Sequence, residues 1–395
     1  MTNTPVQPTE VAFFTECYRP IINGVVASID ALRAGLVDRG TGVTIVAPHF
    51  PHERTDDDAL VRLPSLPLPT STGYRLCVPY VSRAARARIE RASVVHVHSP
   101  FVTGWLGANI ARRSRVPLVF TYHTRIDEYA HYAPFESRVA RAAMTALTRT
   151  FANRADAVIV PTAAMQTRLR DIGVRVPIAV VPSSIDVVRF AAGRRTDGAR
   201  ALLGANDSAR VVLAVSRAAK EKHLELAIDA IACLQDARLA IVGDGLHRSL
   251  LEARAAALGV RERVHFTGTL EPAALPDVYA SADAFVFPSP TETQGLVLAE
   301  ALAAGLPIVA VDVPVNREVL GGFGRLVPAS PEAMAAALAA ALAAPRGAAG
   351  AGFARRQFGR DRQAAAVLEV YRSVSLCRTF GTRVRDYAPG SESFR

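Results

Sequence analysis

The sequence predicts an α/β protein built from two doubly wound domains, and three observations point to this fold class. The chain has 395 residues, enough for two domains of about 100–200 residues each. Short apolar runs rich in Val, Ile and Leu recur along it, separated by segments with helical periodicity. This alternation stops at a polar stretch, residues 191–208, and then starts again. Apolar strands that alternate with helices are typical of parallel sheets covered on both faces.

The first series of elements begins with a buried strand at residues 11–15. A loop follows, and apolar residues then recur at helical spacing from Val25 to Leu36, until Gly40 ends the helix. Further strands are predicted at 43–47, 94–98, 117–123, 157–161 and 178–182, and helices at 102–113, 136–153 and 163–172. We expect these elements to form an N-terminal domain, residues 1–190.

The second series follows residues 191–208, which we expect to be a linker. Strands are predicted at 210–216, 238–245, 263–268, 284–289 and 307–311, and helices at 222–235, 246–258, 272–281, 295–304, 331–343 and about 359–374. We expect a C-terminal domain at residues 209–354. The remaining segment, residues 355–395, contains a helix and the tail.

The composition excludes several classes of protein. Half of the residues are hydrophobic, which excludes a disordered chain. The four cysteines form no CxxC pair, so neither a disulfide framework nor a zinc site is expected. The N-terminus lacks a signal peptide, and no run approaches the roughly 18 apolar residues of a membrane span. These features favour a cytoplasmic protein.

The net charge of +10 is unevenly distributed. The positive excess lies in residues 1–190 and 355–395, and only two of the basic residues are lysines, Lys220 and Lys222. A basic surface attracts nucleic acid, anionic lipid or phosphorylated substrates. Because no nucleic-acid-binding motif is found, we expect no nucleic-acid partner.

Loops after the strands hold most candidate functional residues, because parallel sheets bind ligands at the carboxyl ends of their strands. Gly24 opens a helix, where backbone N–H groups can approach a phosphate. Arg217 and Lys222 flank one loop of the second domain and suit a diphosphate. The turn at 243–245 is either structural or part of a nucleotide pocket, and the loop that ends at Leu270 offers backbone groups to a nucleobase.

Two glutamates form the most informative pattern. Glu292 lies in a loop of small polar residues and is positioned to reach sugar hydroxyls, whereas Glu300 lies in an otherwise apolar helix that begins near Gly295. A carboxylate in such a helix is costly without hydrogen-bond donors, which ribose hydroxyls or the protein would supply. In the first domain, His123 follows a strand, and its role is either structural or functional. His96 and His98 share one side of a strand, but no third ligand suggests a metal site.

Together these motifs resemble the retaining glycosyltransferases of family 4. The resemblance covers about residues 11–373 and rests on Glu292 and Glu300 followed by residues 304–309, on Arg217 with Lys222, and on segments 23–26 and 117–124. It implies the GT-B fold, in which two Rossmann-like doubly wound domains face each other across a cleft. It also implies that the C-terminal helix crosses back onto the N-terminal domain.

The resemblance implies transfer of a hexose from a nucleotide-diphosphate sugar, with retention at the anomeric carbon and with no metal or other cofactor. His123 and Glu292 would be catalytic residues, and Glu292 would contact the donor sugar. The implied donor-binding residues provide charges or backbone groups; they are Gly24, Arg217, Lys222, Leu270, Gly295, Leu296 and Glu300.

Segments 14–20 and 123–132 resemble bacterial enzymes that glycosylate diacylglycerol or related lipids. This similarity implies a UDP-glucose or GDP-mannose donor and a lipid or glycolipid acceptor, with Glu16, Tyr129 and His131 near the acceptor. The basic regions then favour peripheral binding to an anionic membrane surface on the cytoplasmic face. Alternatives are a soluble acceptor, such as a secondary metabolite or oligosaccharide, a nucleotide-sugar epimerase, and a non-catalytic nucleotide-binding protein. Two departures from the family pattern, Ser216 and residues 183–186, leave the charged positions intact.

Overall fold

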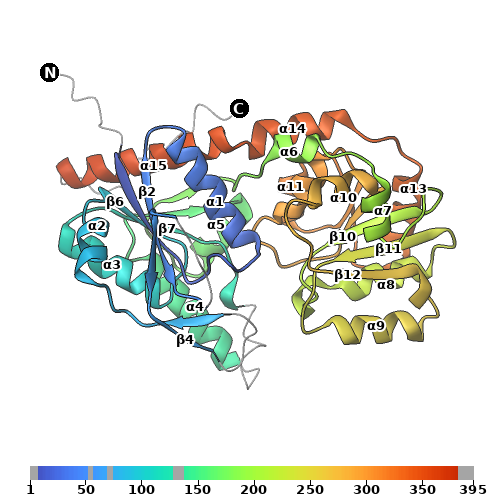
Figure 1. Cartoon of the computed structure of the whole chain (residues 1–395), viewed down its shortest axis with the longest axis horizontal. Helices are drawn as coiled ribbons and strands as arrows, with labels where there is room; N and C mark the ends of the chain where they lie inside the picture. The colour runs from blue at the N-terminus through green and yellow to red at the C-terminus, as the bar shows by residue number, and fades with distance from the viewer. Residues whose placement is uncertain (1–7, 52–56, 69–73, 128–137, 381–395) are drawn as a thin grey trace. The chain divides into compact units, whose positions relative to one another are not determined.

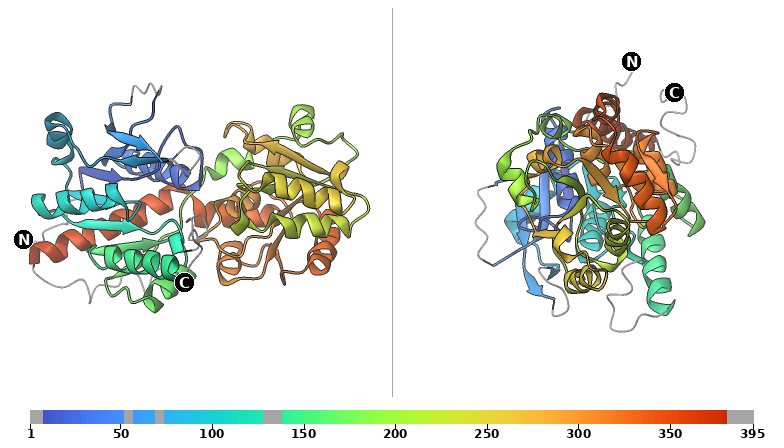
Figure 2. Two further views of the ribbon diagram at one scale, coloured as in Figure 1. Left: turned by 90° about the horizontal axis from the view of Figure 1, so that it is seen from below. Right: turned by 90° about the vertical axis from the view of Figure 1, so that its right-hand side faces the viewer.

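The computed structural model describes residues 8–51, 57–68, 74–127 and 138–380. The chain forms two compact units. The first unit comprises residues 1–184 and 360–395, and the second comprises residues 185–359. Each unit contains one parallel sheet with helices on both faces (Figure 1, Figure 2). The predicted fold class, an α/β protein with two doubly wound sheets, is confirmed.

The first unit contains a seven-stranded sheet in the order β3-β2-β1-β6-β7-β8-β9. All neighbouring strands in it are parallel. Its strands are mostly short and buried, and they are β1 (Glu10–Phe14), β2 (Gly42–Pro48), β3 (Leu60–Leu63), β6 (Val94–Val97), β7 (Leu118–Thr121), β8 (Ala157–Val160) and β9 (Ile178–Val180).

Helices α1 (Gly24–Val37) and α15 (Arg360–Phe380) pack side by side on one face of this sheet (Figure 1). Their apolar residues join the strands in one core, to which α15 contributes Val367, Leu368 and Tyr371. The other helices of this unit are α2 (Arg83–Ile89), α3 (Val102–Ser114), α4 (Arg138–Ala152) and α5 (Ala163–Asp171). A separate antiparallel hairpin is formed by β4 (Ser65–Pro67) and β5 (Arg75–Cys77).

The second unit contains a six-stranded parallel sheet in the order β12-β11-β10-β13-β14-β15. Its strands are β10 (Arg210–Val215), β11 (Ala237–Val242), β12 (Val264–Gly268), β13 (Ala284–Phe287), β14 (Ile308–Val311) and β15 (Arg325–Val327). Helices α8 (Leu224–Ala232), α9 (Arg248–Ala257) and α13 (Pro331–Leu342) pack on one face and complete the core there.

The remaining helices of this unit pack against one another. They are α6 (Val187–Ala191), α7 (Asp197–Leu202), α10 (Leu275–Ser281), α11 (Leu296–Ala303), α12 (Pro314–Leu320) and α14 (Ala348–Phe358). Short 3₁₀ turns occur at η2 (Lys220–Lys222) and η3 (Arg261–Arg263). In the part of the chain that the structure describes, no helix has the length and apolarity needed to cross a membrane.

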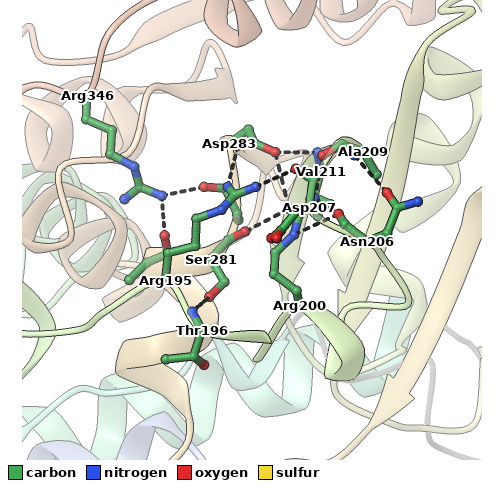
Figure 3. Close-up of polar contacts among 12 residues, drawn as sticks. Arg195, Thr196, Arg200, Asn206, Asp207, Ala209, Val211, Ser281, Asp283 and Arg346 are labelled. Atoms are coloured by element: carbon green, nitrogen blue, oxygen red, sulfur yellow. Dashed lines mark hydrogen bonds and ion pairs between the residues drawn. The ribbon is translucent and has the colours of Figure 1, made fainter. Parts of the chain in front are cut away.

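Residues 191–208, the expected linker, are instead folded into the second unit. Arg200 on α7 is only 1% exposed, although it is a charged residue. Its guanidinium donates to Ser281 O at 2.9 Å and to Asn206 O at 3.1 Å, and it pairs with Asp283 at 3.4 Å (Figure 3). Buried charges require such partners. The segment is therefore folded onto the second unit through Arg200 rather than being a free linker, although most of its other polar residues are exposed.

Candidate active site

The candidate donor residues gather where the strand order of the second sheet reverses, between β10 and β13. These neighbouring strands are followed by the loops that hold Arg217 and Lys222 on one side and Glu292 on the other. In open parallel sheets such a reversal leaves a crevice at the carboxyl ends of the strands, where ligands bind. The second sheet therefore places these three residues at the position expected for a binding site.

Lys222 and Glu292 form a direct ion pair. The ammonium Nζ lies 2.5 Å from Glu292 Oε1, and both side chains are 16% exposed. Burial alone would raise the pKa of Glu292. The charge and hydrogen bond of Lys222, together with Ser289 and Arg217, outweigh this effect, so the pKa of Glu292 is lowered. Glu292 is consequently held as a carboxylate beside two cations.

Arg217 lies on the same loop, and a second carboxylate holds it. Its Nη2 donates to Glu221 at 2.9 Å, while the Glu221 carbonyl accepts the Thr291 hydroxyl at 3.0 Å. The Arg217 side chain is 41% exposed, so part of it is accessible to solvent. The bond from Thr291 also ties the Arg217 loop to the Glu292 loop.

The turn after β11 packs closely against the backbone of the Arg217 loop. Gly243 has φ +125°, and a Cβ there would lie 2.1 Å from the Ser216 carbonyl oxygen. A Cβ on Gly245 would lie 2.4 Å from the Ala218 carbonyl oxygen, and Ala218 N–H donates to Asp244 O at 3.0 Å. The glycines are therefore required for close backbone packing, which favours the structural alternative for this turn.

Glu300 lies on α11 and faces a buried tyrosine. The Tyr279 hydroxyl donates to Glu300 Oε2 at 2.7 Å, and Tyr279 is fully buried between Phe190 and Phe285. Burial raises the pKa of Glu300 to about 7, although Tyr279 and the charge of Arg189 oppose this shift. One carboxylate oxygen is thus held by the protein.

Gly295 and Leu296 form the start of α11. Gly295 adopts φ +75°, a conformation that glycine accepts without strain, and Leu296 is the first helical residue. Backbone N–H groups in the first turn of a helix have no partner within the helix and can bind an anion. Leu270 lies after β12, partly buried, and nothing in the described contacts joins it to the Lys222–Glu292 pair.

In the first unit, Glu16 and Gly24 follow β1, one of the two strands, β1 and β6, between which the strand order reverses. Glu16 accepts the Thr103 backbone N–H at 2.7 Å and so caps helix α3. Burial raises the pKa of this carboxyl, while hydrogen bonds from Thr103 and Val102 partly offset the effect. Gly24 is exposed at the start of α1, where Asn23 caps the helix by accepting from Val26 N–H at 3.0 Å.

His123 follows β7 and stacks on His98. Its Nε2 lies 2.8 Å from His98 Nδ1, and the ring centroids are 5.1 Å apart. Burial lowers the pKa of His123 to about 4 and that of His98 well below its usual value, so both rings are neutral near pH 7. Within the described residues, His98 Nε2 is buried without a hydrogen-bond partner. An unpaired acceptor is more readily tolerated than an unpaired donor, so His98 carries its proton on Nδ1 and donates to His123.

His96 lies beside this pair but has different partners. Its Nδ1 lies 2.7 Å from the Tyr371 hydroxyl of α15, and its Nε2 lies 2.6 Å from Thr121 Oγ1. Both ring nitrogens are therefore satisfied, and His96 attaches α15 to the sheet. Tyr129 and His131, the other expected acceptor residues, lie outside the described residues.

Sequence reasoning missed Tyr279 and His98 as partners of candidate residues. A tyrosine in an apolar helix gives no signal in itself, because its hydroxyl partner is 21 positions away. The alternation of His96 and His98 did place both rings on one side of the strand. The contact between His98 and His123 could have been anticipated, because His98 follows one strand and His123 follows the strand that pairs with it in parallel.

Comparison with protein-family models matches residues 22–189 to Glycosyltransferase Family 4. Residues 197–356 match Glycosyl transferases group 1. The two matches cover most of both units and include Gly24, His123 and the Lys222–Glu292 pair.

Two curated relatives cover most of the chain. The alpha-monoglucosyldiacylglycerol synthase of Streptococcus pneumoniae is 29% identical over 347 residues, which are 85% of this chain and 79% of the relative. A GDP-mannose-dependent alpha-mannosyltransferase of Mycolicibacterium smegmatis is 33% identical over 319 residues, 78% of this chain and 81% of the relative. Among solved structures, sucrose-phosphate synthase from Thermosynechococcus elongatus has a TM-score of 0.74 at 20% identity, covering 93% of this chain and 100% of that chain. This last similarity concerns the fold alone.

Proposed function

The chain belongs to glycosyltransferase family 4 and is a hexosyltransferase, and from this premise we propose that it transfers a hexose from a nucleotide-diphosphate sugar to a hydroxyl group of a membrane lipid or glycolipid. We propose retention at the anomeric carbon. UDP-glucose and GDP-mannose are the two donors to test first, because the relatives are named for glucosyl and GDP-mannose-dependent transfer.

The ion pair of Lys222 and Glu292 beside Arg217 is the observation that carries this proposal. Departure of a nucleoside diphosphate leaves negative charge on its phosphate oxygens, and fixed cations in a partly desolvated site stabilise that charge. Lys222 provides a compact ammonium and Arg217 a planar fork of donors. We assign charge compensation to these two residues and propose no resident metal or other cofactor.

The carboxylates bind the rest of the donor in this proposal. Glu292 accepts hydrogen bonds from hydroxyls of the transferred hexose, and Glu300 Oε1 accepts from the ribose while Tyr279 holds Oε2. Gly295 and Leu296 supply backbone N–H groups at the start of α11. In the first unit, His123 orients the reacting sugar or the acceptor, and Gly24 contributes a backbone N–H group to the phosphates.

The transfer step needs no covalent nucleophile. The acceptor oxygen bonds to the anomeric carbon on the face that the diphosphate leaves, the carbon–oxygen bond to the diphosphate breaks, and the acceptor proton passes to a diphosphate oxygen. A neutral His123 suits the role of orienting the sugar or the acceptor, because a cationic imidazole would instead attract the negatively charged diphosphate. One relative is named as an alpha-mannosyltransferase, and the other is named as a synthase of a glucosylated diacylglycerol.

The test is a product assay with UDP-glucose and GDP-mannose, each with diacylglycerol or phosphatidylinositol in mixed micelles. We expect one donor to give a hexosyl lipid. The one-bond C1–H1 coupling of its anomeric centre in NMR should show the α configuration, for glucose and mannose alike. A β-linked product would contradict retention. A hexosylated soluble oligosaccharide without lipid product would favour the soluble-acceptor alternative, and a changed sugar without any acceptor would indicate an epimerase.

A further inference from the structure

Three histidine rings lie against one another in the first unit. His98 directly follows β6, and His123 follows β7, which pairs with β6 in parallel. The centroid of the His98 ring lies 4.3 Å from that of His96 and 5.1 Å from that of His123. The ring of Phe13 meets His98 edge to face, with the centroids 4.7 Å apart. Because these three rings pack around it, the imidazole of His98 is held in one orientation.

His98 and His123 differ in their access to a substrate. His98 is only 4% exposed, whereas His123 is partly exposed beyond the end of its strand. A side chain that a substrate cannot reach can still act on a reaction through a residue that it contacts. His98 makes such a contact through Nδ1, which lies 2.8 Å from His123 Nε2. His98 is therefore placed to act on His123 and not on the substrate itself.

This hydrogen bond decides which nitrogen of His123 carries its proton. Within the described residues, His98 Nε2 is buried and has no hydrogen-bond partner. If His123 donated through Nε2–H, the proton of neutral His98 would lie on this nitrogen, and a buried donor would be left unpaired at a cost in free energy. If His98 donates through Nδ1–H instead, His123 Nε2 is the acceptor, and the proton of neutral His123 lies on Nδ1. The second arrangement is favoured because it avoids the unpaired donor.

We propose that His98 is a positioning residue that fixes the tautomer of His123, so that His123 presents an Nδ1–H donor to a substrate oxygen. This inference rests on the proposed function, in which His123 orients the reacting sugar or the acceptor. An N–H group donates to a hydroxyl oxygen, whereas an unprotonated ring nitrogen only accepts from the hydroxyl. Without His98, His123 would exchange between these two states, and only a fraction of the molecules would hold the substrate in the reactive orientation.

His96 provides a matched control, because it is buried in the same group of rings but has other partners. The Tyr371 hydroxyl lies 2.7 Å from His96 Nδ1, and Thr121 Oγ1 lies 2.6 Å from His96 Nε2. Tyr371→Phe removes one of these hydrogen bonds and keeps the aromatic ring. It should therefore lower the stability toward urea without changing the tautomer of His123.

Long-range proton–nitrogen correlation NMR of the full chain, with isotope-labelled histidine, measures the tautomer directly. His123→Gln identifies the signals of His123 by their loss. In wild-type protein and in Tyr371→Phe, we expect His123 Nδ1 to carry the proton and Nε2 to be unprotonated. In His98→Leu, the two nitrogens should show averaged shifts. His98→Asn places a side-chain amide donor near the position of Nδ1 and should restore the wild-type pattern. A proton on His123 Nε2 in wild-type protein would overturn the inference.

The kinetics of hexosyl transfer measure whether the tautomer affects the reaction. His98→Leu should lower kcat about 10–100-fold, a loss comparable to that caused by removing a partner that orients a metal-binding histidine. His98→Asn should recover most of this loss, and Tyr371→Phe should keep the wild-type kcat. Calorimetric binding of UDP or GDP, equal in the variants and in wild-type protein, verifies that the variants remain folded.

Equal losses of kcat in His98→Leu and His98→Asn, with nucleotide binding intact, would mean that His98 only fills space, and the inference would fail. A Tyr371→Phe variant as impaired as His98→Leu would have the same meaning. If His123→Gln keeps the full kcat, the proposed role of His123 is wrong, and so is this inference. Wild-type protein that shows the expected tautomer but transfers hexose to no acceptor would instead contradict the proposed function and leave the tautomer assignment standing.

Discussion

Lys222 differs from Lys220 in its surroundings, although one residue separates them in the sequence. Lys222 contacts Glu292 from a largely buried position. Lys220 is exposed, and in the described residues it forms no ion pair. The two lysines are therefore a natural pair of target and control.

We expect Lys222→Ala to lower kcat/KM for the donor by about 10²–10³-fold, because the leaving diphosphate loses a preorganised cation. Lys220→Ala should change it less than about twofold. Steady-state kinetics with varied donor concentration measures both variants. Equal losses in the two variants would mean that general surface charge, rather than the ion pair, serves the donor.

If Glu300 binds the donor as we propose, donor binding should depend on pH. Burial raises its pKa to about 7, so the carboxyl is largely protonated at pH 6 and ionised at pH 8. The ionised form accepts hydrogen bonds more strongly than the protonated form, so affinity for the nucleotide sugar should rise through pH 7. Tyr279→Phe removes a donor that lowers this pKa, so the midpoint should move to higher pH.

Calorimetric titration with the nucleotide sugar at pH 6, 7, 8 and 9 measures this midpoint, and Glu300→Gln serves as the control that should flatten the profile. A Tyr279→Phe variant with lower affinity at every pH but an unchanged midpoint would indicate that Tyr279 only supports packing.

The sequence pointed to the charged residues of the site but not to their mutual contacts. Lys222 and Glu292 are 70 positions apart, and only the parallel pairing of β10 with β13 brings their loops together. Tyr279 and His98 were not predicted as partners, because their hydrogen bonds connect different helices and strands. Such partners depend on tertiary structure, which local periodicity does not contain.

At the scale of elements, the turn after β11 fixes the loop that holds Arg217. We expect Gly243→Ala to lower the free energy of unfolding by about 2–4 kcal/mol, since it adds both backbone strain and a clash with the Ser216 carbonyl. The displaced loop should also raise KM for the donor.

Gly198→Ala on α7 is the matched control, because no atom beyond its chain neighbours and its own helix backbone lies within 4 Å of the Cβ position. Urea denaturation followed by circular dichroism should find it within about 0.5 kcal/mol of wild type. If Gly243→Ala proves equally harmless, the turn is more plastic than its contacts indicate.

Strands were predicted better than the connections between them. Continuous apolar runs identified the central strands of both sheets, whereas short elements such as β3, β4, β5 and β15 were missed because they are only three or four residues long and none is continuously buried. Residues 191–208 were misread as a linker for a related reason. Arginines and small residues resemble a solvated segment unless the acceptors of Arg200 are known.

At the scale of the molecule, the chain leaves the first unit at Ser184 and returns to it at Arg360. The two ends of the second unit lie together, because Ile185 N–H donates to Phe358 O at 3.0 Å. The first unit, by contrast, is incomplete without α15, whose residues Val367, Leu368 and Tyr371 are part of its core.

These connections predict different behaviour for two fragments. Residues 185–359 should fold alone with a cooperative urea transition, because their core and both ends are complete. Residues 1–184 should form an expanded state that binds ANS, because removal of α15 exposes the apolar face of the sheet.

Since Arg217, Lys222, Glu292 and Glu300 all lie in the second unit, its fragment should also bind UDP or GDP in calorimetry. Adding a peptide of residues 360–380 to fragment 1–184 should restore native near-ultraviolet circular dichroism. A fragment 1–184 that unfolds cooperatively without the peptide would show that α15 is dispensable for this core.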